Sequence, residues 1–223
     1  MGSAKPVDPG ATEVRARAER RIIDALALSS HYSLGLEVAR CIEASLGGAA
    51  ALQSHGIDAK VIPCAAIAAS ADRKLVAVLG HRLETALTHP LAQVALAGPP
   101  ELHTRGHEYP FHFAILATLV NGRHVFCDLT SWQLRQSTQG ALRVPLAVVG
   151  ELEGYPVLDG EDGSVVEYMA CPYPERVMSQ LEGPPMPAEF VESLLVLIDE
   201  ALACDLDREA LAVRVRELKE GAA

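Results

Sequence analysis

Apolar residues recur at helical spacing near both ends of the chain and once in its first third, and shorter runs rich in β-branched residues lie between these segments. This pattern predicts an α+β fold, in which an antiparallel sheet of about five or six strands carries helices. The helices are expected over residues 12–27, 41–55, 187–203 and 207–219. The strands are expected within 109–130 and over residues 59–69, 74–79, 141–149, 155–158 and 164–169.

The segment 41–55 carries a cysteine at its first position and two adjacent glycines in its interior. If the helix begins at Cys41, its free N–H groups and the positive end of its dipole lie at the thiol and would stabilise a thiolate. Residues 36–40 could instead extend the helix backwards and leave Cys41 in its middle. Gly47 and Gly48 each cost a helix about 1 kcal/mol relative to alanine. We therefore expect a second backbone, with the sheet as the natural candidate, to approach closely at the two glycines.

The segment 109–130 is predicted to form a β-hairpin, because two apolar runs flank Asn121-Gly122. A two-residue turn at Asn121-Gly122 would pair position 112 with 131 and put His112 and Asp128 on opposite faces of the sheet. A three-residue turn over 120–122, with Gly122 in the left-handed conformation, would pair 112 with 130 and 114 with 128. We predict the three-residue turn, which puts both side chains on one face and brings the carboxylate within reach of the imidazole.

Cys41, His112 and Asp128 together supply the groups that thiol-based acyl chemistry needs. Asp128 would orient the imidazole of His112, His112 would take the thiol proton, and Cys41 would attack a carbonyl carbon to give a thioester. Water would then make the protein a peptidase, amidase or deamidase, whereas an amine would make it an acyltransferase. The backbone N–H of Cys41 is one expected oxyanion donor. His107 and Tyr109, in the loop before the histidine strand, are the candidate substrate-binding residues.

The same residues carry a resemblance to a known family. The helix that Cys41 opens is followed by Gly56-Ile57-Asp58-Ala59 and a strand, which resembles the Gly-Ile-x-Ala ending of the cysteine helix in the transglutaminase-like superfamily. His112 at the start of a strand and Asp128-Leu129-Thr130 at the end of the next are similar to the histidine strand and the Asp-x-Thr motif of that family. The resemblance covers roughly residues 36–132. It implies a papain-like core in which the cysteine helix packs on an antiparallel sheet, with further helices at both ends; members include peptidases, transglutaminases and proteins without catalytic function.

Two other interpretations stay open. The first is a protein of the same fold that has lost catalysis and binds a protein partner through the cleft in which the family's active site lies. The chain departs from the family pattern in Ala39-Arg40 before the cysteine and in Ala114 two residues after the histidine.

The second alternative is a metal site. Histidine and carboxylate side chains suit zinc or iron, and such residues gather before the predicted hairpin: Glu101, His103, His107, Glu108 and His112. Residues 98–107 have the composition of a loop rather than of a helix that would present two histidines on one face. We therefore expect neither a metal nor another cofactor.

Composition and charge narrow the class of partner. The net charge of -10 disfavours a nucleic-acid or anionic-membrane surface, and a peptide or protein amide is the expected substrate. The five cysteines form no Cys-x-x-Cys pair, and Cys64 and Cys127 fall in predicted strands, where we expect them to be buried and inert. The chain has neither the apolar run of a signal peptide nor eighteen consecutive uncharged apolar residues. A cytoplasmic location is therefore expected.

A chain of 223 residues with 49% hydrophobic content is expected to form a single compact domain. Residues 12–175 would make the transglutaminase-like catalytic core, and residues 176–223 a C-terminal helical extension packed on it. The apolar run over 190–198 suits either packing on the core or self-association. The C-terminal helices are therefore the candidate surface for a homo-oligomer.

Overall fold

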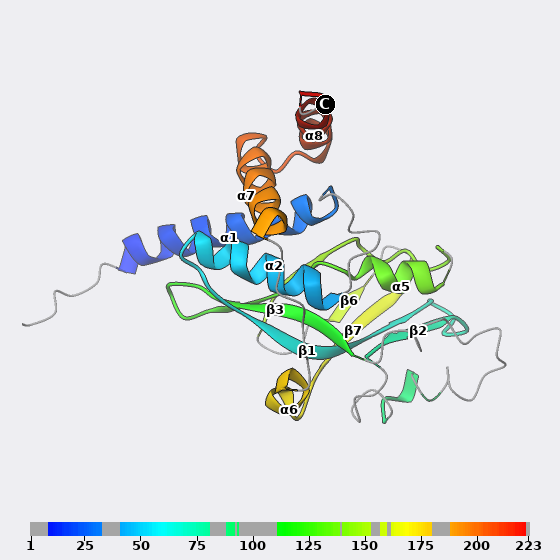
Figure 1. The fold of residues 1–223 in the computed structure, drawn as a ribbon. Coiled ribbons are helices and arrows are strands. Elements are labelled where there is room, and N and C mark those ends of the chain that lie inside the picture. The colour runs from blue at the N-terminus through cyan, green and yellow to red at the C-terminus, as the bar shows by residue number, and fades with distance from the viewer. Residues whose placement is uncertain are drawn as a thin grey trace, which may run out of the picture.

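The structure is a computed structural model, and it describes residues 9–32, 41–80, 88–91, 93, 111–138, 140–152, 157–159, 162–179 and 188–221. Within these ranges the fold is α+β, with six helices and a curled antiparallel sheet (Figure 1). The helices are α1 (Pro9–Ser30), α2 (Cys41–Ser54), α5 (Trp132–Ser137), α6 (Pro174–Ser179), α7 (Ala188–Ala203) and α8 (Arg208–Gly221). The strands are β1 (Asp58–Ala69), β2 (Val76–Leu79), β3 (His112–Thr118), β4 (His124–Asp128), β5 (Val148–Glu151), β6 (Val157–Asp159) and β7 (Val165–Ala170).

The long strand β1 organises the sheet. The strand order is β5-β4-β3-β1-β7-β6, and β2 pairs with β1 outside this path. Residues 58–64 of β1 pair with β3, and residues 66–69 pair with β2 on the same edge, while β7 pairs along the opposite edge. In the part of the chain that the structure describes, the sheet has seven strands, more than the five or six that the sequence predicts.

Three helices cover one face of the sheet. Figure 1 shows α1, α2 and α7 together above β1 and β3. Their apolar side chains, such as Leu26 and Leu52, share one buried cluster with Ile115 and Cys127 of the sheet. The other face of the sheet has its own cluster, which includes Phe126 of β4 and Tyr168 of β7. Residues at even positions of β3 and β4 belong to this second face, because side chains alternate along a strand.

The predicted three-residue turn between β3 and β4 is confirmed. Ile115 pairs with Cys127 and Thr118 with His124, which is the register that follows from a turn over 120–122. Gly122 has a φ of 82°, the left-handed conformation that this turn requires. The hairpin therefore directs the side chains of positions 112 and 128 to the same face of the sheet.

Close contacts do occur at the two glycines of α2, but side chains rather than a backbone make them. A Cβ atom at Gly47 would overlap the ring carbon Cε1 of Phe190 in α7. A Cβ atom at Gly48 would lie 2.7 Å from Cδ1 of both Ile115 and Leu129. The glycines therefore make room for the α7 aromatic ring and for the apolar residues that rise from the sheet.

The strand predicted over 141–149 is wrong for most of its length. Residues 141–147 are not in a strand, and β5 covers only Val148–Glu151. Leu142 and Val144 are nevertheless buried, with 1% and 4% of their surface exposed. Their alternation with exposed residues reflects packing against the sheet without ladder hydrogen bonds, to which Pro145 could not donate. The strands expected over 155–158 and 164–169 correspond to β6 and β7, which pair antiparallel.

Both C-terminal helices are confirmed, and α7 is part of the main core. Leu194 and Ile198 lie in the same buried cluster as α1 and α2, and the Ser29 hydroxyl donates a hydrogen bond to the carbonyl of Leu197 at 2.8 Å. Asp205 and Leu206, both with positive φ, connect α7 to α8. Among the helices that the structure describes, none combines the length and the apolar character needed to cross a bilayer. The boundary at residue 175 and the homo-oligomer stay predictions.

Candidate active site

The β3–β4 hairpin brings His112 and Asp128 together. His112 is the first residue of β3 and Asp128 the last residue of β4, and neither side chain has any exposed surface. The imidazole Nε2 lies 2.8 Å from Oδ2 of Asp128, a normal distance for a charge-assisted hydrogen bond. Two of the three predicted catalytic residues are therefore paired as the sequence predicts.

Four hydrogen bonds hold the Asp128 carboxylate in place. Its Oδ2 accepts the hydrogen bond from His112 and another from the Tyr168 hydroxyl at 2.7 Å. Its Oδ1 accepts the backbone N–H of Thr130 at 2.8 Å and the Thr130 hydroxyl at 3.1 Å. Burial by itself would raise the pKa of Asp128, but His112, Tyr168 and Thr130 together lower it. The carboxylate therefore stays ionised although it has no contact with solvent.

The charge of Asp128 controls the protonation of His112. Burial opposes the charged imidazolium, yet the carboxylate, its hydrogen bond and the side chain of Cys41 together raise the pKa of His112 to about 10. At neutral pH the imidazole therefore carries a second proton. Nε2 is used by Asp128, and Nδ1 is buried and has no hydrogen-bond partner among the described residues.

Cys41 lies beside His112 at the start of β3. Its Sγ is 3.7 Å from the carbonyl oxygen of Phe111, to which the thiol can donate, and 4% of the residue is exposed. One turn further along α2, the Ser45 hydroxyl donates to the carbonyl of Phe113 at 3.0 Å and fixes the helix against β3. The described part of α2 begins at Cys41, and residues 36–40, on which the position of the helix start depends, lie outside the described residues.

The cysteines at 64 and 127 are buried strand residues, as predicted. Both have no exposed surface, and Cys64 is directly opposite His112 in the β1–β3 register. Burial, followed by the nearby charge of Asp128, raises the pKa of both thiols far above their ordinary value. Cys64 therefore stays protonated even though it lies next to the candidate site.

Several predicted residues cannot be placed. The candidate substrate-binding residues His107 and Tyr109 lie outside the described residues, and so do Glu101, His103 and Glu108 of the alternative metal site. Within the ranges that the structure describes, no three His, Cys, Asp or Glu side chains are arranged to hold a metal ion.

Tyr168 is the member of the site that the sequence does not reveal. It lies on β7, which is separated from β4 in the sheet by β3 and β1, and its ring contacts Phe126 with 4.7 Å between the ring centroids. The β-branched and aromatic residues over 164–169 predict a strand. To predict that Tyr168 lies next to Asp128, one would need to know the order of strands that are not neighbours in sequence, and local sequence patterns do not contain this information.

Comparison with known proteins adds no relative. The chain matches no protein-family model, no curated protein and no solved structure. The resemblance to the transglutaminase-like superfamily therefore stays a prediction from the residues of the hairpin and the cysteine helix.

Proposed function

We propose that the protein is a cysteine-dependent hydrolase or acyltransferase that acts on an amide bond of a peptide or protein through a thioester intermediate. The observation that supports this most directly is the buried hydrogen bond between His112 and Asp128 beside the Cys41 thiol. The Cys41 side chain contributes to the raised pKa of His112, and Nδ1 has no other partner among the described residues, so the ring nitrogen that Asp128 does not use is free to exchange a proton with the thiol. Of the two reactions, we favour hydrolysis of the amide over transfer of the acyl group to an amine.

The proposed reaction begins with the thiol proton on Nδ1 of His112. The Cys41 thiolate attacks the carbonyl carbon of the amide, and the tetrahedral intermediate collapses as the imidazolium gives its proton to the leaving amine. This leaves an acyl group on Sγ and a neutral imidazole. Water, or an acceptor amine, then attacks the thioester while His112 takes one of its protons. The second tetrahedral intermediate then collapses, releases the acid or the new amide, and leaves the Cys41 thiolate beside the protonated imidazole.

Asp128 acts through His112 in this proposal. Its hydrogen bond to Nε2 fixes the ring so that Nδ1 faces the sulfur, and its negative charge stabilises the imidazolium. The backbone N–H of Cys41 is the proposed oxyanion donor.

The burial of the site favours the second candidate, a catalytically silent protein of the same fold that binds a partner. Cys41 is 4% exposed, and neither His112 nor Asp128 reaches the surface. In addition, the Cys41 thiol has a second possible acceptor in the Phe111 carbonyl, 3.7 Å from Sγ. An enzyme must open this site so that an acyl group reaches the sulfur, whereas a partner can bind over the cleft without reaching these three buried side chains.

Trapping of the acyl group distinguishes the two candidates. The protein is mixed with p-nitrophenyl acetate, quenched in acid and digested, and the acetylated cysteine is identified by mass spectrometry before and after treatment with hydroxylamine, which cleaves thioesters. The enzyme proposal requires hydroxylamine-sensitive acetylation of Cys41 that is lost in His112→Ala. Cys204→Ser is the matched control, since Cys204 is partly exposed and lies far along the chain in the turn after α7. Acetylation of Cys204 with none on Cys41 would favour the silent protein.

A further inference from the structure

A pocket with a volume of about 830 Å³ lies where the two ends of the curled sheet approach each other. Residues 143–147, which lead into the edge strand β5, form one wall of it. The other wall comes from β6 and β7 at the opposite end of the strand order. None of Cys41, His112 and Asp128 lines this pocket. We call it the arginine pocket, after Arg135, Arg143 and Arg208.

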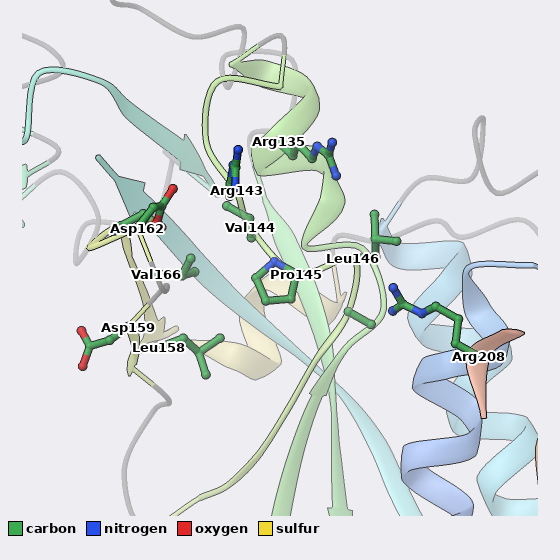
Figure 2. A pocket seen from close by; sticks show the side chains of 12 residues that line it. Arg135, Arg143, Val144, Pro145, Leu146, Leu158, Asp159, Asp162, Val166 and Arg208 are labelled. Atoms are coloured by element: carbon green, nitrogen blue, oxygen red, sulfur yellow. Dashed lines mark hydrogen bonds between the residues drawn. The ribbon is translucent and has the colours of Figure 1, made fainter. Parts of the chain in front are cut away.

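These three arginines reach the pocket from separate elements. Arg135 belongs to α5, Arg143 to the segment before β5, and Arg208 is the first residue of α8. Figure 2 shows Arg135 and Arg143 at one end of the pocket, whereas Arg208 reaches in from the side of α8 beside Leu146. Two cations from neighbouring segments and a third from the C-terminal helix therefore border one space.

The three guanidinium groups are not neutralised within the described part of the chain. None of them forms an ion pair there within 4.0 Å, although the net charge of the chain is -10. Elsewhere many described arginines are paired with carboxylates, namely Arg15, Arg17, Arg20, Arg21, Arg123 and Arg214. Within the described ranges Arg73, Arg176 and Arg216 also lack an ion pair, so half of the six unpaired arginines border this one pocket, in a protein that has an excess of acidic residues.

Two aspartates also border the pocket but leave it with an excess of positive charge. Asp162 accepts the backbone N–H of Ser164 at 3.0 Å, within its own turn. The hydrogen bonds of Ser164, with a smaller effect of Arg143, lower the pKa of Asp162, so that it is ionised at neutral pH. The carboxylate of Asp159 is directed away from Arg135 and Arg143 in Figure 2. Among the described residues that line the pocket, three cations therefore accompany two anions.

The remaining lining is largely apolar. Val144 and Val166 are buried residues of the cluster on this face of the sheet, and Leu158 packs against them. A volume of about 830 Å³ lies within the range of small-molecule sites, which is about 300–1,000 Å³. The lining thus combines an apolar surface with cationic groups at two places.

We propose that the arginine pocket binds an organic anion that carries more than one phosphate or carboxylate group. Arg135 and Arg143 hold one anionic group and Arg208 another, because the planar guanidinium donates paired hydrogen bonds to the oxygens of either group. The apolar body of the ligand lies on Val144, Leu158 and Val166. This site is independent of the proposed chemistry at Cys41.

Calorimetric titration of the full chain with pyrophosphate and with citrate, at low ionic strength, tests the proposal. We expect saturable binding of at least one of these probes, and the tighter one identifies the preferred anionic group. Arg143→Gln and Arg208→Gln should each weaken binding by about fivefold or more, as expected for loss of a charged hydrogen-bond donor. Arg216→Gln is the matched control, because it removes the same charge from the exposed surface of α8 outside the pocket.

Two results would overturn the proposal. The first is the absence of saturable binding for both probes at millimolar concentration. The second is equal weakening by Arg208→Gln and Arg216→Gln, which would mean that the anion responds only to the overall charge of the protein.

Discussion

Tyr168→Phe removes one hydrogen bond from the buried Asp128 carboxylate and leaves the ring in place. The phenol donates to Oδ2 at 2.7 Å, the same oxygen that accepts from His112. The ring itself packs on Phe126, and phenylalanine preserves that contact. The substitution therefore tests the hydrogen bonds of the phenol, to Asp128 and with the Ser131 side chain, without removing the ring.

The expected cost follows from the burial and the charge of the acceptor. A hydrogen bond to a charged group contributes about 1.5–3 kcal/mol, and Asp128 has no exposed surface on which water could replace the lost donor. We expect the free energy of unfolding at pH 7 to fall by this amount. The pKa of Asp128 is lowered in the folded protein, so its stabilising effect is present above the unfolded value of about 3.9 and is lost as the pH falls through the folded value. The difference in the free energy of unfolding between the parent protein and Tyr168→Phe should therefore become smaller as the pH falls below about 3.9.

Urea denaturation followed by circular dichroism measures this difference. Tyr173→Phe is the control, because Tyr173 is 62% exposed and loss of its hydroxyl should change stability by less than about 0.5 kcal/mol. If Tyr168→Phe unfolds at the same urea concentration as the parent protein at pH 7, Tyr168 does not stabilise Asp128, and the account of the buried network fails.

Three further predictions concern the pH range of the pair and two glycines. The pKa of His112 rises from 6.5 to about 10 on folding, so the parent protein should be more stable than His112→Gln by the full amount below about pH 6.5. This difference in stability should disappear as the pH rises through about 10. Urea midpoints of both proteins across this range measure the difference, and a difference that persists unchanged at pH 10.5 would contradict the prediction. Gly47→Ala should lower the free energy of unfolding by about 1–2 kcal/mol, because overpacking against Phe190 exceeds the gain in helix propensity. The same substitution should cost less in a chain that also carries Phe190→Leu, and equal costs in the two chains would exclude the contact. Gly122→Ala should lower the free energy of unfolding by about 1 kcal/mol through the positive φ alone, since nothing lies within 4 Å of the added carbon. Thermal denaturation measures this loss, and an unchanged melting temperature would argue against the three-residue turn.

The parts of the site that depend on local structure could be predicted from the sequence. The turn length at Asn121-Gly122 fixes the register of β3 and β4, and this register decides that His112 and Asp128 share a face. The helical pattern from Cys41 similarly predicts α2 and its packing on the sheet. These inferences need only neighbours in sequence and the alternation of side chains.

The parts that depend on distant pairings could not be predicted. Tyr168 reaches Asp128 only because β7 pairs with β1 across the sheet, and nothing near residue 168 specifies that partner. The apolar alternation at Leu142 and Val144 was misleading for a related reason, because burial against a sheet produces the same pattern as membership of it. The arginine pocket likewise exists only through the arrangement of α5, α8 and the two ends of the sheet.

The central claim is that His112 withdraws the proton from the Cys41 thiol, and the rate of alkylation at Cys41 tests it most directly. The parent protein and His112→Ala are treated with iodoacetamide between pH 5 and pH 9, and peptide mass spectrometry follows each cysteine separately. We predict that Cys41 reacts near pH 6, faster than the other cysteines, and that His112→Ala removes this reactivity. If Cys41 reacts equally slowly in both proteins and only at high pH, no thiolate–imidazolium pair exists and the proposed enzyme activity is wrong.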